Sequence, residues 1–252
     1  MTDIHTHLLP GLDDGPEIIA ESLEVAQAAY SAGTRTIITT PHILNMLDTN
    51  RNNHIVSEYR EFKDILEVEC PGLNLLLGSE IYFRPNLAEL VHHEVATLNG
   101  TGKYMLVEFS LTDIPKGFER ELVNLRSQGV VPIIAHPERN IAALKKPSFI
   151  GRMIDAGGLI QLNSGSLTGS FGRPVRKLAH NLLKRGWVHF IASDTHGLNH
   201  RGPGLEAAIS AAADVIGMAE ARRLVDEYPE VVIEGREWPD NKALVSSVGG
   251  VK

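Results

Sequence analysis

The 252-residue chain has a single cysteine, Cys70, so it cannot form an intrachain disulfide, and a reducing, cytoplasmic compartment is favoured. It has no continuous apolar run of about 18 residues, so no membrane insertion is expected. Polar and acidic residues follow Met1 directly, and no signal peptide is expected. The formal net charge of -7 leaves no broad basic face, so nucleic acid is not an expected partner.

Short apolar runs alternate along the chain with longer runs that carry apolar residues at helical spacing. The runs predict strands over 2–5, 34–40, 73–77, 104–109, 130–135, 159–162 and 188–192. Helices are predicted over 17–32, 55–68, 86–93, 118–128, 148–156, 174–185, 204–216 and 219–228. Loops are expected over 41–53 and 163–172, and a further short strand over 231–233.

Seven β-then-α units with near-continuous apolar strands indicate an α/β fold with a parallel sheet covered by helices. The first strand is followed by a histidine-rich segment instead of the glycine-rich turn of an open doubly wound sheet. A closed (β/α) barrel is therefore the predicted architecture, with its active site at the C-terminal ends of the strands. We expect a single domain over 1–237 and a loose C-terminal tail over 238–252.

Polar residues able to bind metal or phosphate follow nearly every predicted strand. His5 and His7 lie two apart, so in a strand both side chains point to the same face. In chain order, the other residues at strand ends are Asp13, Asp14, His42, Glu80, Glu108, His136, Arg139, Asn163, Asp194, His196 and Arg201. In a barrel all of these would meet at one mouth, where imidazole and carboxylate groups are typical metal ligands.

Each of these residues also has a simpler interpretation. Asp13 and Asp14 could serve only as turn formers beside glycine. Glu108 lies between apolar residues, where a buried carboxylate needs a compensating charge. His136 could be a core histidine with satisfied hydrogen bonds, and Arg139 and Arg201 could be surface residues. The recurrence of such residues after nearly every strand favours the functional interpretation.

The chain resembles the PHP superfamily, and within it the bacterial capsular-polysaccharide tyrosine-protein phosphatases. The matching pieces are Asp-Ile-His-Thr-His, Leu-Pro-Gly-Leu-Asp-Asp-Gly, Thr-Thr-Pro-His, Gly-Ser-Glu-Ile-Tyr, Val-Glu-Phe, Ala-His-Pro-Glu-Arg and Ser-Asp-Thr-His, within residues 3–201. The resemblance implies a distorted (β/α)7 TIM-like barrel, the PHP fold, that holds three divalent metal ions. Manganese is the metal that the family suggests, and iron or zinc would also suit the ligands.

The resemblance also implies a division of the metal ligands. The first ion would take His5, His7, Glu80 and Asp194. The second would share Glu80 and add Glu108 and His136, and the third would take Asp14, His42 and His196. Arg139 and Arg201 would bind the phosphoryl group, and either Asp14 or His42 would protonate the leaving oxygen. Four carboxylates against three divalent ions leave a net positive charge that suits a phosphoester dianion.

The leading hypothesis is a metal-dependent protein-tyrosine phosphatase that acts on a capsule or exopolysaccharide tyrosine kinase, by in-line attack of a metal-bridging hydroxide. A cysteine-based phosphatase is excluded, because no arginine lies six residues after Cys70. The alternatives are a small-molecule phosphatase, as for histidinol phosphate, a phosphodiesterase, or a metal-binding regulatory module. The oligomeric state stays open, as does a gating role for the 41–53 loop.

Overall fold

The structure is a computed structural model that describes residues 1–199 and 201–239. Within those residues the strands are β1 (Thr2–Thr6), β2 (Thr36–Thr39), β3 (His42–Ile43), β4 (Asn74–Leu77), β5 (Glu80–Tyr82), β6 (Tyr104–Glu108), β7 (Val131–Ala135), β8 (Leu159–Asn163) and β9 (Phe190–Ala192). The helices are α1 (Ile19–Ser31), α2 (Thr49–Glu69), α3 (Phe118–Ser127), α4 (Ile141–Lys145), α5 (Ser148–Asp155), α6 (Ser164–Thr168), α7 (Arg173–Lys184), α8 (Glu206–Ile216), α9 (Met218–Arg223) and α10 (Glu227–Ile233). Short 3-10 helices cover Leu87–Leu90, Glu94–Ala96, Leu98–Gly100 and Pro137–Arg139.

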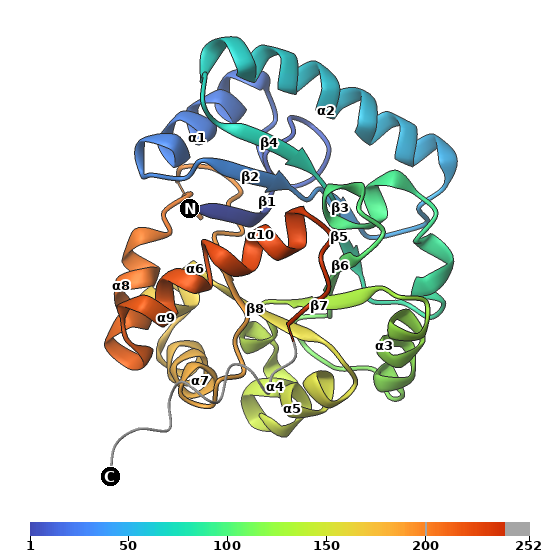
Figure 1. Ribbon diagram of the computed structural model, residues 1–252, viewed down its shortest axis with the longest axis vertical. Helices are drawn as coiled ribbons and strands as arrows, with labels where there is room; N and C mark the ends of the chain where they lie inside the picture. Colours follow the sequence, from blue (N-terminus) through green and yellow to red (C-terminus); the bar gives the residue numbers. More distant parts are fainter. Residues whose placement is uncertain (200, 240–252) are drawn as a thin grey trace.

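The strands form a parallel barrel with the helices around it (Figure 1). β2 pairs with β4, and after a short break the same two stretches of chain pair again as β3 with β5. Because β2 with β3, and β4 with β5, each occupy one position, the two sheets make seven strand positions around the barrel. The sheets are β1-β2-β4 and β3-β5-β6-β7-β8-β9. A parallel bridge between Thr6 and Thr195 joins β1 to the end of β9 and closes the ring. The predicted seven-stranded (β/α) barrel is confirmed.

The central strands are apolar and buried along their whole length. Leu106 in β6, Ile133 in β7 and Ile160 in β8 are fully buried. Such runs suit strands that face the barrel interior on one side and covering helices on the other. Burying a side chain of this size contributes about 2 kcal/mol relative to leaving it in water. The strands therefore form a stable frame that can carry polar residues at one end.

The C-terminal part of the described chain closes the opposite end of the barrel, at the starts of the strands. The Tyr104 hydroxyl, at the start of β6, donates to the Arg236 carbonyl at 2.6 Å. The Trp238 ring packs against Phe190, the first residue of β9, and against Tyr228 of α10. Trp238 lies in the predicted tail, whose residues 240–252 are outside the described residues.

The predicted helix over 86–93 is only a short 3-10 helix, Leu87–Leu90, and the one over 219–228 is interrupted between α9 and α10. Three further predictions were wrong because a helix was missed. Residues 231–233 form the end of α10 instead of a strand, with Val231 and Val232 buried beside the barrel. Residues 49–53 belong to α2, which begins after Asp48, whose side chain accepts a hydrogen bond from the Arg51 backbone N–H at 2.8 Å. The 163–172 segment contains α6, capped by Asn163 in the same way. Among the described helices, none combines the length and hydrophobicity needed to cross a bilayer.

Candidate metal centre

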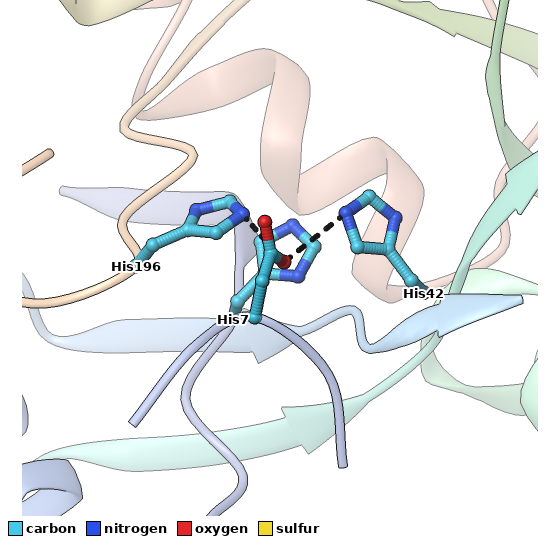
Figure 2. Close-up of side chains that lie close together, drawn as sticks. His7, His42 and His196 are labelled. Atoms are coloured by element: carbon cyan, nitrogen blue, oxygen red, sulfur yellow. Dashed lines mark ion pairs between the residues drawn. The ribbon is translucent and has the colours of Figure 1, made fainter. Parts of the chain in front are cut away.

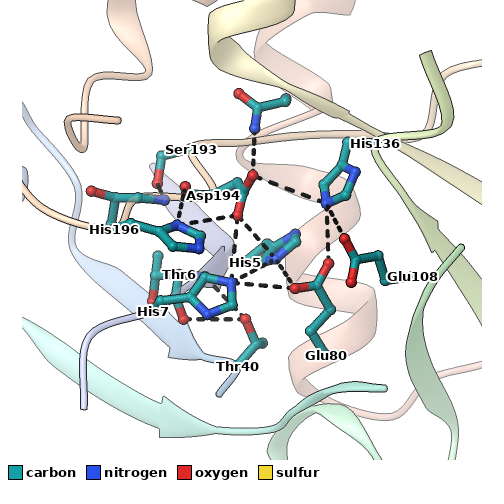
Figure 3. Close-up of polar contacts among 12 residues, drawn as sticks. His5, Thr6, His7, Thr40, Glu80, Glu108, His136, Ser193, Asp194 and His196 are labelled. Carbon is teal, nitrogen blue, oxygen red and sulfur yellow. Dashed lines mark hydrogen bonds and ion pairs between the residues drawn. The ribbon is translucent and has the colours of Figure 1, made fainter. Parts of the chain in front are cut away.

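The nine residues predicted as metal ligands lie together where the strands end. Figure 3 shows His5, His7, Glu80, Glu108, His136, Asp194 and His196 of this set. We refer to all nine as the donor cluster: His5, His7, Asp14, His42, Glu80, Glu108, His136, Asp194 and His196. Their side-chain nitrogen and oxygen atoms fall into three groups, in each of which the donors lie within 4.8 Å of one another. The groups are His7 with Asp14, His42 and His196; His5 with Glu80, His136 and Asp194; and His42 with Glu80 and Glu108.

Four donor atoms at the base of the cluster have the spacing of a metal cage. His5 Nε2 lies 3.2 Å from His7 Nε2, and these nitrogens lie 3.2 and 3.3 Å from Glu80 Oε2. Both nitrogens are 3.4 Å from Asp194 Oδ1. Donors at the corners of a tetrahedron lie about 3.3–3.4 Å apart when each metal bond is about 2.0–2.1 Å long. The base of the cluster thus fits a transition metal ion.

The two carboxylate oxygens of this cage are left without hydrogen bonds in the described part of the chain. Glu80 Oε2 and Asp194 Oδ1 are buried and make only ion-pair approaches to histidine nitrogens. His42 Nδ1, which faces Glu80, and His196 Nε2, which faces Asp14, also lack hydrogen bonds among the described residues. A buried polar atom with no partner costs about 1–3 kcal/mol. Four such atoms within one cluster are therefore expected where cations complete the site.

Hydrogen bonds to the far side of the rings fix which nitrogen faces the cluster. His7 Nδ1 lies 2.7 Å from Asp13 Oδ2, and His5 Nδ1 lies 3.1 Å from Gln161 Oε1. His196 Nδ1 lies 2.9 Å from the Asp194 carbonyl oxygen. Since each of these acceptors holds the proton on Nδ1, Nε2 carries the lone pair toward the cluster. This orientation is the one that a metal-binding imidazole requires.

A turn glycine brings Asp13 to its position. A side chain at Gly15 would place a Cβ atom 2.6 Å from the His7 carbonyl oxygen, so only glycine allows the turn to approach this closely. In this turn Asp13 accepts from the Gly15 and His42 backbone N–H groups, both at 3.0 Å, as well as from His7. Asp13 therefore links the turn, β1 and β3.

The outer side of the cluster, where His42 and His196 lie beside His7 (Figure 2), is more exposed than its base. Asp14 Oδ1 lies 3.1 Å from His196 Nε2 and 3.4 Å from His42 Nε2, and the Asp14 side chain is 61% exposed. Glu80, in contrast, is fully buried. The ring centroids of His7 and His196 are 3.9 Å apart, so His7 faces both the base and this outer group.

The third side of the cluster joins two carboxylates to His136. Glu80 Oε1 lies 3.1 Å from His136 Nε2, and Glu108 Oε1 lies 3.8 Å from the same atom. The second oxygen of Glu80 lies 3.0 Å from His42 Nδ1. Glu80 thus directs Oε1 toward His136 and Oε2 toward His42. This is the geometry expected of a carboxylate shared between two cations.

Both predicted arginines contact one oxygen of Asp194. Arg139 Nη1 and Arg201 Nη1 donate to Asp194 Oδ2 at 2.8 and 2.9 Å, and Asn163 Nδ2 donates to it at 2.7 Å. Three donors on Oδ2 leave Oδ1 to face the histidines. A guanidinium has five N–H groups, so each arginine keeps donors for an anion in the mouth.

Burial and mutual contact shift the pKa values in the cluster. Burial alone would raise the pKa of Glu80 and Asp194, but the surrounding histidines, His5 foremost, hold both well below their usual range. Burial and the neighbouring Glu80 together raise the pKa of Glu108. Burial, assisted by His7, lowers the pKa of His196 to about 4. These shifts mark a region where charged groups are packed against one another.

Two cluster residues have unusual backbone conformations. His136 has a φ of 31° and Asp194 a φ of 53°, in the left-handed region that residues other than glycine rarely adopt. His136 directly follows β7, and Asp194 lies two residues after the end of β9. Backbone strain of this kind is concentrated at functional sites. It turns both side chains from the strand direction into the cluster.

Several residues that support the donor cluster were not identified from the sequence. Gln161 orients His5, and Glu138 is buried while accepting hydrogen bonds from the Asn163 backbone and the Ser166 hydroxyl at 3.0 and 2.6 Å. The Phe171 ring lies 4.3 Å from the Arg139 guanidinium carbon. A glutamine inside the apolar strand Leu-Ile-Gln-Leu was the one signal available for Gln161, since a buried amide needs partners.

Comparisons with known proteins identify a family and several relatives that resemble this chain. A family model described as capsular polysaccharide synthesis, CpsB/CapC, matches residues 1–234. The chain is 36% identical over 202 residues to tyrosine-protein phosphatase YwqE of Bacillus subtilis, covering 80% of this chain and 79% of that protein. It is 30% identical over 239 residues to tyrosine-protein phosphatase CpsB of Streptococcus pneumoniae, covering 92% and 98%.

A solved structure matches over nearly the whole chain. It belongs to a study of YwqE from Bacillus subtilis and CpsB from Streptococcus pneumoniae, described as unique metal-dependent tyrosine phosphatases. The TM-score is 0.88 at 32% identity, with 94% of this chain and 96% of that chain covered.

Proposed function

The chain belongs to the CpsB/CapC capsular polysaccharide synthesis family, and from this premise we propose that it is a metal-dependent tyrosine phosphatase. The observation that carries the proposal is the cage at the base of the cluster. Its donor atoms lie 3.2–3.4 Å apart and have no other hydrogen bonds in the described chain. Such a cage in a barrel mouth, beside two arginines, suits a phosphate ester.

The proposed ligand set is the donor cluster with three divalent ions, manganese being the metal we propose. His5, His7, Glu80 and Asp194 hold the first ion. Glu80, Glu108 and His136 hold the second, and Asp14, His42 and His196 hold the third. The mixture of imidazole and carboxylate donors supports manganese, iron or zinc alike, so the choice of manganese rests on the family resemblance.

The chain's own residues bind and orient the substrate. Bound divalent ions supply an acidified water molecule and positive charge for the phosphoryl group. Arg139 and Arg201 bind the non-bridging oxygens through the N–H groups that Asp194 does not occupy. Asp14 or His42, on the open side of the cluster, protonates the tyrosyl oxygen. Phenolate leaves more easily than alkoxide, so this proton contributes less than for phosphoserine.

The proposed physiological substrate is a phosphotyrosine on an exopolysaccharide-synthesis tyrosine kinase. The family description, capsular polysaccharide synthesis, supports this assignment. The test is a pull-down and dephosphorylation assay with a purified, autophosphorylated exopolysaccharide-synthesis tyrosine kinase. Loss of its phosphotyrosine signal on adding the metal-loaded protein is expected, and an unchanged signal would contradict the assignment of the kinase.

The activity itself is tested by removing and restoring metal. Protein stripped with a chelator is expected to release no phosphate from a phosphotyrosine peptide, and added Mn²⁺ is expected to restore release. Metal analysis is expected to give three ions per chain. Parallel assays with a phosphoserine peptide, histidinol phosphate and a phosphodiester separate the proposed activity from a small-molecule phosphatase or a phosphodiesterase.

A matched pair of histidine variants tests the site. His136→Ala is expected to lower turnover by at least about 100-fold, because a ligand should matter more than the supporting partners whose loss costs about 10- to 100-fold. His54→Ala, on the exposed face of α2, is the control and should retain full activity. Phosphate release that is equal in the two variants would contradict the site.

A further inference from the structure

A pocket of about 670 Å³ opens beside the outer side of the donor cluster. Asp14 and His42 of the cluster form one end of it. The other end is formed by the segment between β3 and α2, with Leu44 and Met46, and by Arg51 at the start of α2. The pocket is therefore continuous with the proposed phosphate site but extends beyond the cluster into a different chemical environment.

The far wall of the pocket is apolar and exposed. The side chain of Leu44 is 60% exposed and that of Met46 is 68% exposed. Single exposed apolar residues are ordinary, but these two lie within three residues and line one pocket. Neither belongs to the buried core, so folding alone does not account for their positions.

Arginine contacts hold this wall in place. Arg84 Nη1 donates to the Asn45 carbonyl oxygen at 3.3 Å, and Arg84 Nη2 lies 3.5 Å from Met46 Sδ. Across the pocket, Arg51 Nη2 donates to the Leu12 carbonyl oxygen at 3.1 Å. The wall thus contacts Arg84, two residues after the end of β5, and the turn that carries Asp14. A preformed apolar surface is suited to binding, because little ordering entropy is lost.

We propose that this pocket binds the polypeptide around the phosphotyrosine, with Leu44 and Met46 contacting an apolar residue next to it. The proposal rests on the proposed phosphatase function and adds the substrate's local sequence to it. A volume of about 670 Å³ exceeds the needs of one phenyl ring and lies in the range of pockets that enclose a drug-sized ligand. Phosphotyrosine with a neighbouring side chain fills such a space.

The chemistry of the pocket lining determines which residue is preferred next to the phosphotyrosine. Asp13, Asp14 and Asp48 line the pocket with a single cation, Arg51, so the pocket outside the metal centre does not favour an acidic neighbour. Leu44 and Met46 favour an aliphatic or aromatic side chain, since its burial removes apolar surface from water on both partners. Met46 is unbranched and adapts to side chains of different shape.

The test combines a change in the substrate with a change in the enzyme. The substrates are a phosphotyrosine peptide with leucine on both sides of the phosphotyrosine, the same peptide with glycine there, and p-nitrophenyl phosphate. The enzymes, loaded with Mn²⁺, are the wild type, the double variant Leu44→Ser/Met46→Ser, and Leu111→Ser. Leu111 is the matched control, because it is 43% exposed after β6 and does not line the pocket.

In the wild type, the leucine peptide is expected to have a kcat/KM about tenfold above that of the glycine peptide. In the double variant this ratio should fall below about twofold, while the rate with p-nitrophenyl phosphate should stay within about twofold of the wild type. Leu111→Ser should behave as the wild type. A ratio that is the same in the wild type and the double variant overturns the proposal.

Other outcomes are also decisive. If the double variant loses p-nitrophenyl phosphate hydrolysis as well, Met46→Gln alone is measured, and a leucine preference that it leaves intact also overturns the proposal. If the wild type releases no phosphate from either peptide, the phosphatase function itself has failed. A wild type that is active on both peptides without preference contradicts only the role of the pocket.

Discussion

Two fully or nearly fully buried histidines, His5 and His189, lie at opposite ends of the barrel and have opposite chemistry. His5 lies among carboxylates at the ends of the strands, and although burial opposes its charged form, Glu80 and Asp194 raise its pKa. His189 precedes β9 at the other end, where burial alone lowers its pKa from 6.5 to about 4. Its Nδ1 accepts a hydrogen bond from the Ile160 backbone N–H at 2.9 Å.

The contrast shows that burial does not decide what a histidine does. His189 has a single satisfied hydrogen bond and packs against the Trp238 ring, with centroids 5.6 Å apart, so it is a neutral packing residue. His5 has a fixed Nδ1 and an Nε2 aimed at unpartnered oxygens, so it is suited to a cation. The partners of a buried imidazole set its role.

The largest test of this contrast removes the charge at the centre of the cluster. Glu80→Gln keeps the side-chain shape but removes the carboxylate shared by two sides of the site. We expect phosphotyrosine hydrolysis to fall by at least about 100-fold and bound metal to decrease. His189→Gln, at the other end, should leave kcat/KM within about twofold. Comparable losses in the two variants would remove the distinction between the two ends.

The second test changes a residue that contacts a donor but is not itself a donor. Gln161→Leu leaves His5 Nδ1 without its acceptor, so the ring is no longer fixed toward the cluster. We expect metal affinity, measured by titration, to fall about 10- to 100-fold. Gln161→Glu restores an acceptor and should recover most of the affinity. Equal affinities in Gln161→Leu and the wild type would show that the ring needs no such support.

The third test uses acid. The folded-state pKa of His189 is about 4, against 6.5 for the free side chain, so the unfolded chain takes up a proton first. Its contribution to stability is fully present above pH 6.5 and is lost as the pH falls toward 4. We expect the wild type to lose about 2 kcal/mol more than His189→Gln between pH 7 and pH 5.

Denaturant unfolding at the two pH values measures this difference, and His54→Gln is the control because His54 is exposed. The other histidines titrate in both proteins and cancel in the comparison. Parallel pH dependences of the wild type and His189→Gln would show that His189 takes up its proton without unfolding the chain.

The smallest expected effect concerns the stacking of Arg139. Phe171→Leu keeps an apolar side chain but removes the ring face that lies 4.3 Å from the guanidinium carbon. A cation–π contact of this kind contributes about 0.5–1 kcal/mol. We expect KM for the phosphotyrosine peptide to rise about threefold with kcat nearly unchanged. A change in kcat alone would place Phe171 outside substrate binding.

Much of this architecture could be predicted from the sequence, because it depends on local patterns. The apolar runs predicted the seven strand positions of the barrel. The polar residues at or just after the end of each run predicted the donors, since parallel strands end at one edge of a barrel. His42, Glu80 and Asp194, which come from distant parts of the chain, could be grouped on that rule alone. Their roles as ligands stay predictions, although the structure brings them together.

The parts that could not be predicted depend on contacts between distant segments. Gln161 supports His5 across 156 residues, and no local pattern encodes that hydrogen bond. No local pattern tells whether His189 is solvated or buried, and only the packing of Trp238 and the hydrogen bond from the Ile160 backbone show that it is a packing residue. The start of α2 was missed for a local reason, because Asp48 in an Asn- and Asp-rich stretch was interpreted as loop instead of helix cap.

The closure between β1 and β9 has a consequence for how the protein matures. The Asp194 backbone N–H donates to the His5 carbonyl at 2.9 Å, and the Ser193 N–H donates to Asp3 Oδ1 at 3.0 Å. Two segments that lie 190 residues apart in the sequence therefore complete the cage together. A nascent chain that ends before Asp194 lacks a wall of the cage, so tight metal uptake is expected to require translation through Asp194 and pairing of this segment with β1.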